Sequence, residues 1–521
     1  MIAFGVLCVL AIVIFLGGIA WGLPSRDTDR FLFGLRAPWS GKEVQQLTGS
    51  RSTVTNQAVD VDRNPLDRNG SVILNRALTD RAEIVRRYRL FTYQPDEMVT
   101  MMALAQMRPS ERDFDPRLYQ YGGLWIYPVG AMLRVAGALH LIQLTPDEAF
   151  YLDHPEAFGR FYVTARLYVV VWSLLGAWVV FSLVQTWTRG SLSAACVACF
   201  CYLMLPVVVN MSHEAKPHLP GAVLTLLTIM AASKYVRTAE LRWFVVAAVA
   251  AGLAVGMVLN AWPALVVLPV ATLLVRQDWR LRCRLAAMSI GLAITVYFVV
   301  NPYVFVHLFN NRELLRSSLG NTREMFQFSI GMRAISNAVM LIAEGATAHI
   351  AIIGAGAMIG FAVIAWRFSV VRQHPIWLLL VPAICSLLQF VMFAKNQPAA
   401  YARFAIFFDL ALLMAAVVGS LELLCRMKWR PELLVLLALT AALSGSRYYA
   451  AFVADVATVT SREQAAQVLE GYWSAGSRRV GVMAEPAPYS VPPLNLFNWQ
   501  LILLPKDYDP SRDPHRPDVI V

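Results

Sequence analysis

Two adjacent carboxylates stand at the start of an amphipathic stretch. They are Asp96 and Glu97, in the sequence Tyr-Gln-Pro-Asp-Glu-Met at 93–98. Paired carboxylates at a helix start beside a membrane surface can act as a general base or hold a metal ion. The proline and the first-turn position also favour acids for helix capping alone, which is how we interpret a second Pro-Asp-Glu at 146–148. On the residues alone, both interpretations of Asp96 and Glu97 stay open.

Four ionisable side chains occupy one short turn between two apolar stretches. They are His213, Glu214, Lys216 and His218, in the sequence Ser-His-Glu-Ala-Lys-Pro-His at 212–218. Ionisable groups in such a turn are costly unless they are used or exposed to water. The two histidines are five residues apart with a proline between them, whereas a zinc protease needs them four apart on one helix. Lys216 can bind a phosphate as a point charge, and a solvated hinge is the alternative.

Two cations, Lys395 and Arg403, lie near a third turn that we expect on the external side. Their position runs against the tendency of Lys and Arg to mark the cytoplasmic face. Phosphate recognition would explain them, and so would extension of their side chains to lipid headgroups. Arg166 lies inside an apolar stretch, where it needs a partner or water.

The composition indicates the class of protein that must position these residues. Of 521 residues, 57% are hydrophobic and 15% are charged, against roughly 25% charged in soluble domains. This excludes an ordinary soluble enzyme, a disordered chain and a disulfide scaffold. The net charge of +11 is explained by membrane topology, so no nucleic-acid partner is expected. The sequence therefore predicts an all-α polytopic membrane protein.

A membrane-spanning helix needs about 20 apolar residues. The sequence predicts about 11 spans, at 2–22, 160–187, 190–210, 217–235, 241–259, 263–275, 283–304, 338–366, 376–394, 403–424 and 431–447. Basic residues in the short loops place the N-terminus in the cytoplasm and the C-terminus outside, provided that the ambiguous stretch 121–142 does not cross. The candidate residues then fall on the external face.

Two domains follow from this topology. Residues 1–447 form a transmembrane domain with external juxtamembrane helices, whose external loop 23–159 carries the acidic pair. Residues 448–521 form a small α/β appendage outside the membrane. In it, Ser461-Arg-Glu-Gln464 predicts a capping box that opens a helix, and short strands are expected at 480–483, 500–504 and 518–521.

The order of these segments resembles that of the GT-C glycosyltransferases, in particular the protein O-mannosyltransferase and lipid A aminoarabinose transferase group. The likeness covers roughly residues 1–425. It is carried by Gln94–Glu97, Tyr121-Gly-Gly with Tyr127-Pro128, Ala165–Leu167, Gly252–Gly256, Asn301-Pro-Tyr303, and Ala394-Lys395 with Tyr401-Ala-Arg403.

The resemblance implies a GT-C-like fold and an inverting sugar transfer in cell-envelope glycan biosynthesis. The donor would be a polyprenyl-phosphate sugar, and the acceptor a hydroxyl of a glycan, lipid or protein. The reaction would take place on the extracytoplasmic face of the inner (plasma) membrane. A transporter or flippase of lipid-linked intermediates, and a non-catalytic subunit with this fold, stay open as alternatives.

The resemblance also implies roles for individual residues. Asp96 would be the general base and Glu97 would orient the acceptor. Lys216, Lys395 and Arg403 would bind the donor phosphate, with His213, Glu214, His218, Tyr121, Tyr303 and Arg166 as further residues lining the site. Many relatives carry an acid where this chain has His218. A divalent metal is a candidate cofactor, and no metal ligands are predicted.

Overall fold

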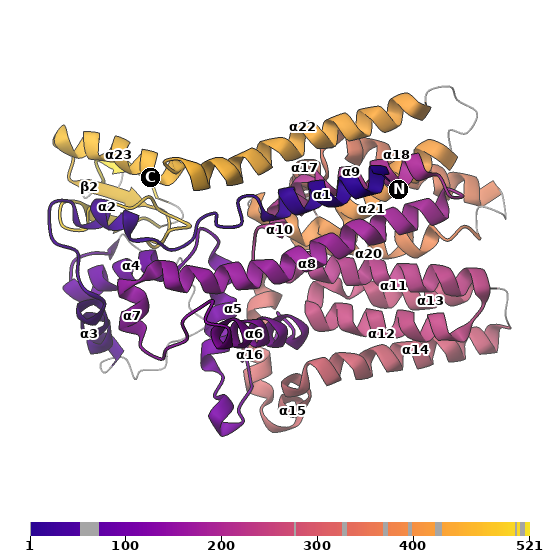
Figure 1. Ribbon diagram of the computed structural model, residues 1–521, viewed down its shortest axis with the longest axis horizontal. Coiled ribbons are helices and arrows are strands. Elements are labelled where there is room, and N and C mark those ends of the chain that lie inside the picture. Colours follow the sequence, from indigo (N-terminus) through magenta and orange to yellow (C-terminus); the bar gives the residue numbers. More distant parts are fainter. Residues whose placement is uncertain are drawn as a thin grey trace. The chain divides into compact units, whose positions relative to one another are not determined.

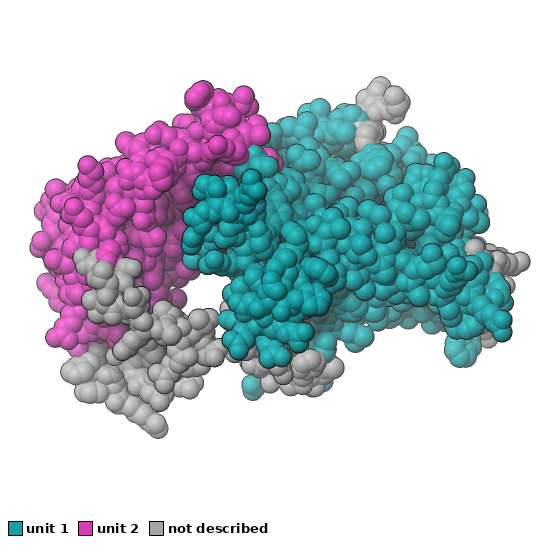
Figure 2. Space-filling model, turned by 90° about the horizontal axis from the view of Figure 1, so that it is seen from below, with its two compact units in different colours: residues 1–19, 100–131, 166–451 teal, residues 20–99, 132–165, 452–521 magenta. Residues whose placement is uncertain are grey.

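The computed structural model of the chain forms two compact units (Figure 2). It describes residues 2–52, 72–275, 278–325, 331–367, 373–393, 399–422, 430–505, 508–510 and 516–521. Unit 1 comprises residues 1–19, 100–131 and 166–451, and unit 2 comprises residues 20–99, 132–165 and 452–521. The predicted domain boundary at 447/448 stays a prediction, and each unit is described by itself below.

Unit 1 is built from helices. It contains α1 (Ile2–Leu16), α9 (Leu192–Leu203), α10 (Pro206–Ser212), α11 (His218–Thr238), α12 (Leu241–Met257), η3 (Leu259–Ala261), α13 (Pro263–Leu274), α14 (Trp279–Val300), α15 (Pro302–Asn310), α16 (Arg312–Met325), α17 (Met332–Ala346), α18 (Ala348–Arg367), α20 (Trp377–Phe393), η5 (Ala399–Ala405) and α21 (Ile406–Glu422). Four helices have residues in both units: α5 (Pro95–Gln106), α6 (Gly123–Ala138), α8 (Pro155–Trp187) and α22 (Arg430–Ala457).

The apolar pattern of each helix decides its place in unit 1. In α21 every residue from Ile406 to Ser420 is buried, as expected for a helix that is apolar all round. In α14 only Ser289 and Ala293 are buried. The α14 helix packs on α12 and α13, and α12 packs on α11, so these helices lie side by side (Figure 1). Thus α21 lies in the core and α14 at the outside of unit 1.

The predicted membrane spans all have apolar helices at their positions. Among the described residues, six helices are long and apolar enough to cross a membrane, or seven if the bent pair α9 and α10 is one span. Four shorter apolar helices, Gly5–Leu16, Leu241–Met257, Leu259–Leu274 and Trp377–Phe393, match the other predicted spans. The ambiguous stretch 121–142 forms α6, and whether it crosses stays a prediction.

One predicted span is corrected. The stretch 338–366 is not one helix, because α17 ends at Ala346 and α18 begins at Ala348. The residue between them, Thr347, has φ 69° and ψ 144°. A β-branched residue with positive φ is a strained exception, and it breaks the helical hydrogen-bond pattern here.

Unit 2 combines a four-stranded sheet with short helices. Its strands are β1 (Val72–Ile73), β2 (Arg479–Val482), β3 (Gln500–Leu503) and β4 (Val519–Ile520), in the order β1-β3-β2-β4. β2 is parallel to β3 and β4, with Val480 opposite Leu501 and Val519, and β1 is antiparallel to β3. The three strands predicted in the tail are confirmed to within one or two residues, whereas the sequence did not predict β1.

The helices of unit 2 pack on this sheet around one apolar core. They are α2 (Asp29–Phe33), α3 (Gly41–Ser52), α4 (Leu78–Leu90), α7 (Glu148–Asp153) and α23 (Ser461–Ser474). Their core includes Val85, Leu152 and Leu501. The predicted helix α23 is confirmed, but its capping box is formed by Thr460 and Glu463, one residue earlier than expected.

A buried ion pair holds the helices of unit 2 together. The Arg89 guanidinium donates from Nε to Asp29 Oδ1 (3.1 Å) and from Nη2 to Oδ2 (2.9 Å), and from Nη1 to the Leu152 carbonyl (3.2 Å). Arg89 is fully buried and Asp29 is 4% exposed. The pair therefore ties α4 to α2 and to α7 through a two-bond contact that only a guanidinium can make.

We expect the Arg89→Lys variant to lower the free energy of unfolding by about 1–3 kcal/mol, because a lysine keeps the charge but leaves buried acceptors unsatisfied. Thermal unfolding of the purified protein in detergent measures the loss. Arg36→Lys is the control, because Arg36 is exposed and contacts the Phe497 ring rather than a carboxylate. Equal unfolding temperatures for Arg89→Lys and wild type would contradict a stabilising role of the pair.

Candidate functional site

The acidic pair lies at the start of α5, in unit 2. Glu97 is fully buried, and its Oε2 accepts a hydrogen bond of 2.6 Å from the Thr92 hydroxyl. Asp96, one residue earlier, is only partly buried. Glu97 is therefore held in one position by its neighbour, whereas the carboxylate of Asp96 is the accessible member of the pair.

A tyrosine that the sequence did not single out lies near Asp96. Burial raises the pKa of the Tyr489 phenol; the Arg87 guanidinium opposes this, and the carboxylates of Glu485 and Asp96 add to it. The phenol is thus protonated near neutral pH, and its ring stacks on Phe91 with centroids 6.4 Å apart. No sequence signal marks Tyr489, because it belongs to a Pro-rich segment far along the chain.

The turn between α10 and α11, in unit 1, buries all four of its ionisable side chains. His213 is fully buried, and Lys216, His218 and Glu214 are 1%, 3% and 6% exposed. Lys216 Nζ lies 3.1 Å from Glu214 Oε2. The solvated-hinge interpretation is wrong, because the turn is enclosed by helices and its charges are paired within the protein.

Two of the predicted site residues contact backbone carbonyl groups just after the end of α1. His213 Nε2 lies 2.7 Å from the Gly17 carbonyl oxygen and its Nδ1 lies 2.7 Å from that of Val209. Arg166 donates from Nη1 to the Ile19 carbonyl at 2.6 Å. Burial lowers the pKa of the His213 imidazole, although both carbonyls oppose this. These contacts give Arg166 and His213 structural roles at the C-terminal end of α1.

His218 joins three elements of unit 1. Its ring lies edge-on to Tyr121 (centroids 6.0 Å apart) and to Phe404 (4.8 Å). Its Nδ1 is 3.5 Å from Asn260 Nδ2. Arg403, which is 7% exposed, places its guanidinium carbon 4.9 Å from the centre of the Phe404 ring. Phe404 thus contacts both His218 and Arg403, and Tyr121 packs on His218.

Three of the motifs that carry the GT-C resemblance meet at Tyr121-Gly122-Gly123. Gly122 N donates to the Met257 carbonyl (3.0 Å), and Gly123 N donates to Asn301 Oδ1 (2.7 Å). A Cβ on Gly122 would lie 1.8 Å from the Gly256 carbonyl oxygen. The glycines therefore let the backbone before α6 pass directly against the ends of α12 and α14.

We expect Gly122→Ala to lower the free energy of unfolding by about 1–3 kcal/mol, because the added methyl group would displace backbone rather than a flexible side chain. Thermal unfolding and the yield of folded protein measure the effect. Gly291→Ala is the matched control, because a Cβ there has no neighbour within 4 Å and alanine favours a helix. A Gly122→Ala protein as stable as the control would disprove the close approach.

A second polar cluster ties the loop before Tyr121 to α15. His307 Nε2 lies 2.7 Å from Asp115 Oδ2, and the Tyr119 hydroxyl donates to Asp115 Oδ1 at 3.0 Å. Tyr303, a predicted site residue, accepts a hydrogen bond of 2.8 Å from Phe114 N. Burial and the Asp115 carboxylate raise the pKa of Tyr119, which keeps its hydroxyl protonated as a donor. Tyr303 therefore positions this loop.

The other predictions about the site stay untested. Lys395 lies outside the described residues. Asp96 and Glu97 belong to unit 2, and the other described candidates belong to unit 1. Within the part of the chain that the structure describes, no three His, Cys, Asp or Glu side chains gather to hold a metal ion.

Comparison with known proteins supports the fold. The family model of dolichyl-phosphate-mannose-protein mannosyltransferases matches residues 156–305, less than a third of the chain. ArnT from Cupriavidus metallidurans bound to undecaprenyl phosphate has a TM-score of 0.50 and 15% identity, over 84% of this chain and 88% of that one. No curated protein sequence matches the chain.

Two further solved structures are more distant. ArnT from the same organism in the apo state has a TM-score of 0.46 and 16% identity, over 81% of this chain and 83% of that one. The oligosaccharyltransferase AglB from Archaeoglobus fulgidus, in complex with an inhibitory peptide and a dolichol-phosphate, has a TM-score of 0.39 and 13% identity, over 80% of this chain and 61% of that one. The match to ArnT with undecaprenyl phosphate shows that the chain has an ArnT-like fold.

Proposed function

We propose that the protein is an integral-membrane glycosyltransferase that moves a sugar from a polyprenyl-phosphate donor to an acceptor hydroxyl. The observation that carries the proposal is the turn 213–218. It buries Lys216 and Glu214 as a pair between two apolar helices, and it lies inside the region matched by the mannosyltransferase family model. Burial of ionisable groups at membrane helices is expensive and typical of a functional site.

The leaving group explains why the reaction needs buried cations. When the bond between the anomeric carbon and the phosphate oxygen breaks, negative charge builds up on the phosphate. Fixed positive charge stabilises that change most strongly where water is excluded. We assign this role to Lys216 and Arg403, which are 1% and 7% exposed. Lys395, outside the described residues, is the third candidate.

The acceptor needs a base that removes the proton of its hydroxyl as the new bond forms to the anomeric carbon. We assign this to Asp96, the accessible carboxylate of the pair, with Glu97 held by Thr92 as the residue that orients the acceptor. Because the acceptor oxygen attacks from the side opposite to the departing phosphate, the configuration of the anomeric carbon is inverted. His218, Tyr121 and Glu214 would line the phosphate side of the reaction.

The lipid carrier and the location also belong to the proposal. ArnT, the structural relative with a TM-score of 0.50, is described with undecaprenyl phosphate bound. A polyprenyl phosphate is accordingly the carrier that we propose here. We place the protein in the plasma membrane with a cytoplasmic N-terminus and with the reaction on the extracytoplasmic face.

A transfer assay in detergent micelles tests this function. The purified protein is mixed with a ³²P-labelled lipid extract of its own membranes, and free polyprenyl phosphate is measured by thin-layer chromatography. Its release on addition of protein and of an envelope extract as the acceptor source supports a transferase. A flippase changes no covalent bond, so unchanged donor lipid with an intact, folded protein would contradict the proposal.

A further inference from the structure

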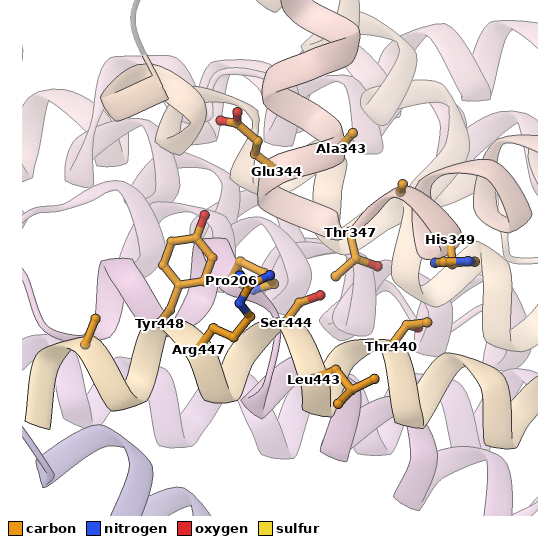
Figure 3. A pocket seen from close by; sticks show the side chains of 12 residues that line it. Pro206, Ala343, Glu344, Thr347, His349, Thr440, Leu443, Ser444, Arg447 and Tyr448 are labelled. Carbon is orange, nitrogen blue, oxygen red and sulfur yellow. The ribbon is translucent and has the colours of Figure 1, made fainter. Parts of the chain in front are cut away.

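A cavity lies in unit 1, and none of the candidate site residues described above lines it (Figure 3). It has a volume of about 610 Å³, within the range of about 300–1,000 Å³ that small-molecule sites occupy. Its polar lining comes from α22 on one side and from the junction of α17 and α18 on the other: Glu344, Thr347, His349, Ser444, Arg447 and Tyr448. None of these residues has a role in the proposed transfer.

The cavity contains two opposite charges that do not pair with each other. Glu344 and Arg447 are both exposed and both line the cavity, and the charges of both act on the Tyr448 phenol. Figure 3 shows Arg447 and Tyr448 rising from α22, with the Glu344 carboxylate on α17 across from them. Charged groups at membrane helices are normally paired or in contact with a ligand or water. An anionic group can thus bind at Arg447 and a cationic group at Glu344.

The polar residues of α22 that line the cavity lie on one side of a largely apolar, outward-facing helix. Arg447 and Tyr448 are three and four positions after Ser444, which places each of them on the same face as Ser444. Only 22% of the apolar window of α22 is buried in the protein, and 28% of that of α18. Leu443, which also lines the cavity, is 68% exposed. Both helices thus present apolar surface for lipid chains beside a polar cavity.

The backbone at the cavity is strained. Thr347, buried in the cavity wall, has φ 69° although it is β-branched. Its hydroxyl accepts a hydrogen bond of 3.4 Å from Ile350 N at the start of α18. Strain of this kind persists where the surrounding structure enforces it, and it concentrates at functional sites. Here the strained turn brings Glu344 of α17 and His349 of α18 to the same cavity.

We propose that this cavity binds the headgroup of a membrane aminophospholipid. Arg447, with the hydroxyls of Ser444 and Tyr448, binds the phosphate. Glu344 binds the ammonium group, and Leu443 with the apolar faces of α18 and α22 contacts the acyl chains. A headgroup with a phosphate and a primary amine matches both charges at once. The inference does not depend on the proposed transfer reaction.

Native mass spectrometry of the full-length protein in detergent tests the site. The protein is titrated with phosphatidylethanolamine, with phosphatidylglycerol, which lacks the amine, and with inorganic phosphate. We expect Arg447→Gln to weaken binding of both lipids about tenfold, because a charged hydrogen bond is lost. We expect Glu344→Gln to weaken binding of phosphatidylethanolamine alone by a similar factor. Arg333→Gln, an exposed arginine on α17 outside the cavity, is the matched control and leaves binding unchanged.

Specific outcomes overturn the proposal. Equal phosphatidylethanolamine binding by wild type, Arg447→Gln and Glu344→Gln would show that the lipid binds elsewhere. Displacement of the lipid by millimolar inorganic phosphate would identify a site for small anions instead. Tyr448→Phe removes only one hydroxyl and is expected to weaken lipid binding two- to threefold with unchanged thermal stability. It tests the site without a change of charge, and wild-type binding by this variant would remove Tyr448 from the site.

Discussion

Lys216→Met is expected to lower the free energy of unfolding by about 3–5 kcal/mol and to abolish sugar transfer. The ammonium group is 3.1 Å from Glu214 Oε2, and both side chains are buried. Removing one partner leaves the other charge without compensation in a region that excludes water. Methionine fills a similar volume, so the expected loss comes from the charge rather than from a cavity.

The double variant Lys216→Met/Glu214→Gln separates stability from function. With both charges removed, no charge is left uncompensated, so most of the lost stability is expected to return. Transfer should stay absent, because the cation that we assign to the donor phosphate is still missing. Thermal unfolding and the micelle assay measure the two effects. A stable double variant with wild-type transfer would contradict the phosphate role of Lys216.

Asp96→Asn is expected to lower kcat for transfer about 10²–10⁴-fold, the usual contribution of a general base. The amide has the same shape and can still cap the helix start, so folding should be unaffected. The KM for the donor lipid should change little, because the base contacts the acceptor rather than the phosphate. Steady-state kinetics in micelles, with thermal unfolding alongside, measures these quantities.

The second Pro-Asp-Glu supplies the matched control for Asp96. Asp147 caps α7, its side chain accepting a hydrogen bond from Ala149 N at 3.0 Å, and asparagine caps helices equally well. Asp147→Asn should therefore transfer sugar at the wild-type rate. If Asp96→Asn also keeps that rate, the acidic pair serves only to cap α5 and the base lies elsewhere.

The sequence predicted the elements better than it predicted their contacts. Hydropathy locates apolar helices because a span needs a long apolar run, and each predicted span has a counterpart. The break at Thr347 escaped prediction because a threonine at positive φ has no sequence signature. The strand β1 escaped because two residues, Val72 and Ile73, are too short for an alternating pattern.

For the candidate site, too, the sequence indicates unusual residues but does not predict their contacts. The sequence marks Lys216 and Glu214 as unusual but cannot show that they pair, because burial depends on the packing of helices distant in sequence. Asp115 and His307 are 192 positions apart, and only the fold brings them together. Arg166 and His213 bond to backbone carbonyls after α1, which no side-chain pattern records. Gly122 lies against Gly256, so two segments that the sequence offers only as separate motifs are in contact.

The most direct test of the central claim is to identify the lipid that the protein holds. The Asp96→Asn protein and the wild type are purified from native membranes in mild detergent, and the co-purified lipids are identified by mass spectrometry. Without its base the enzyme should retain the donor. We predict enrichment of a polyprenyl phosphate bearing a sugar in Asp96→Asn relative to wild type. Bulk phospholipid alone in both preparations would contradict a polyprenyl-phosphate-sugar transferase.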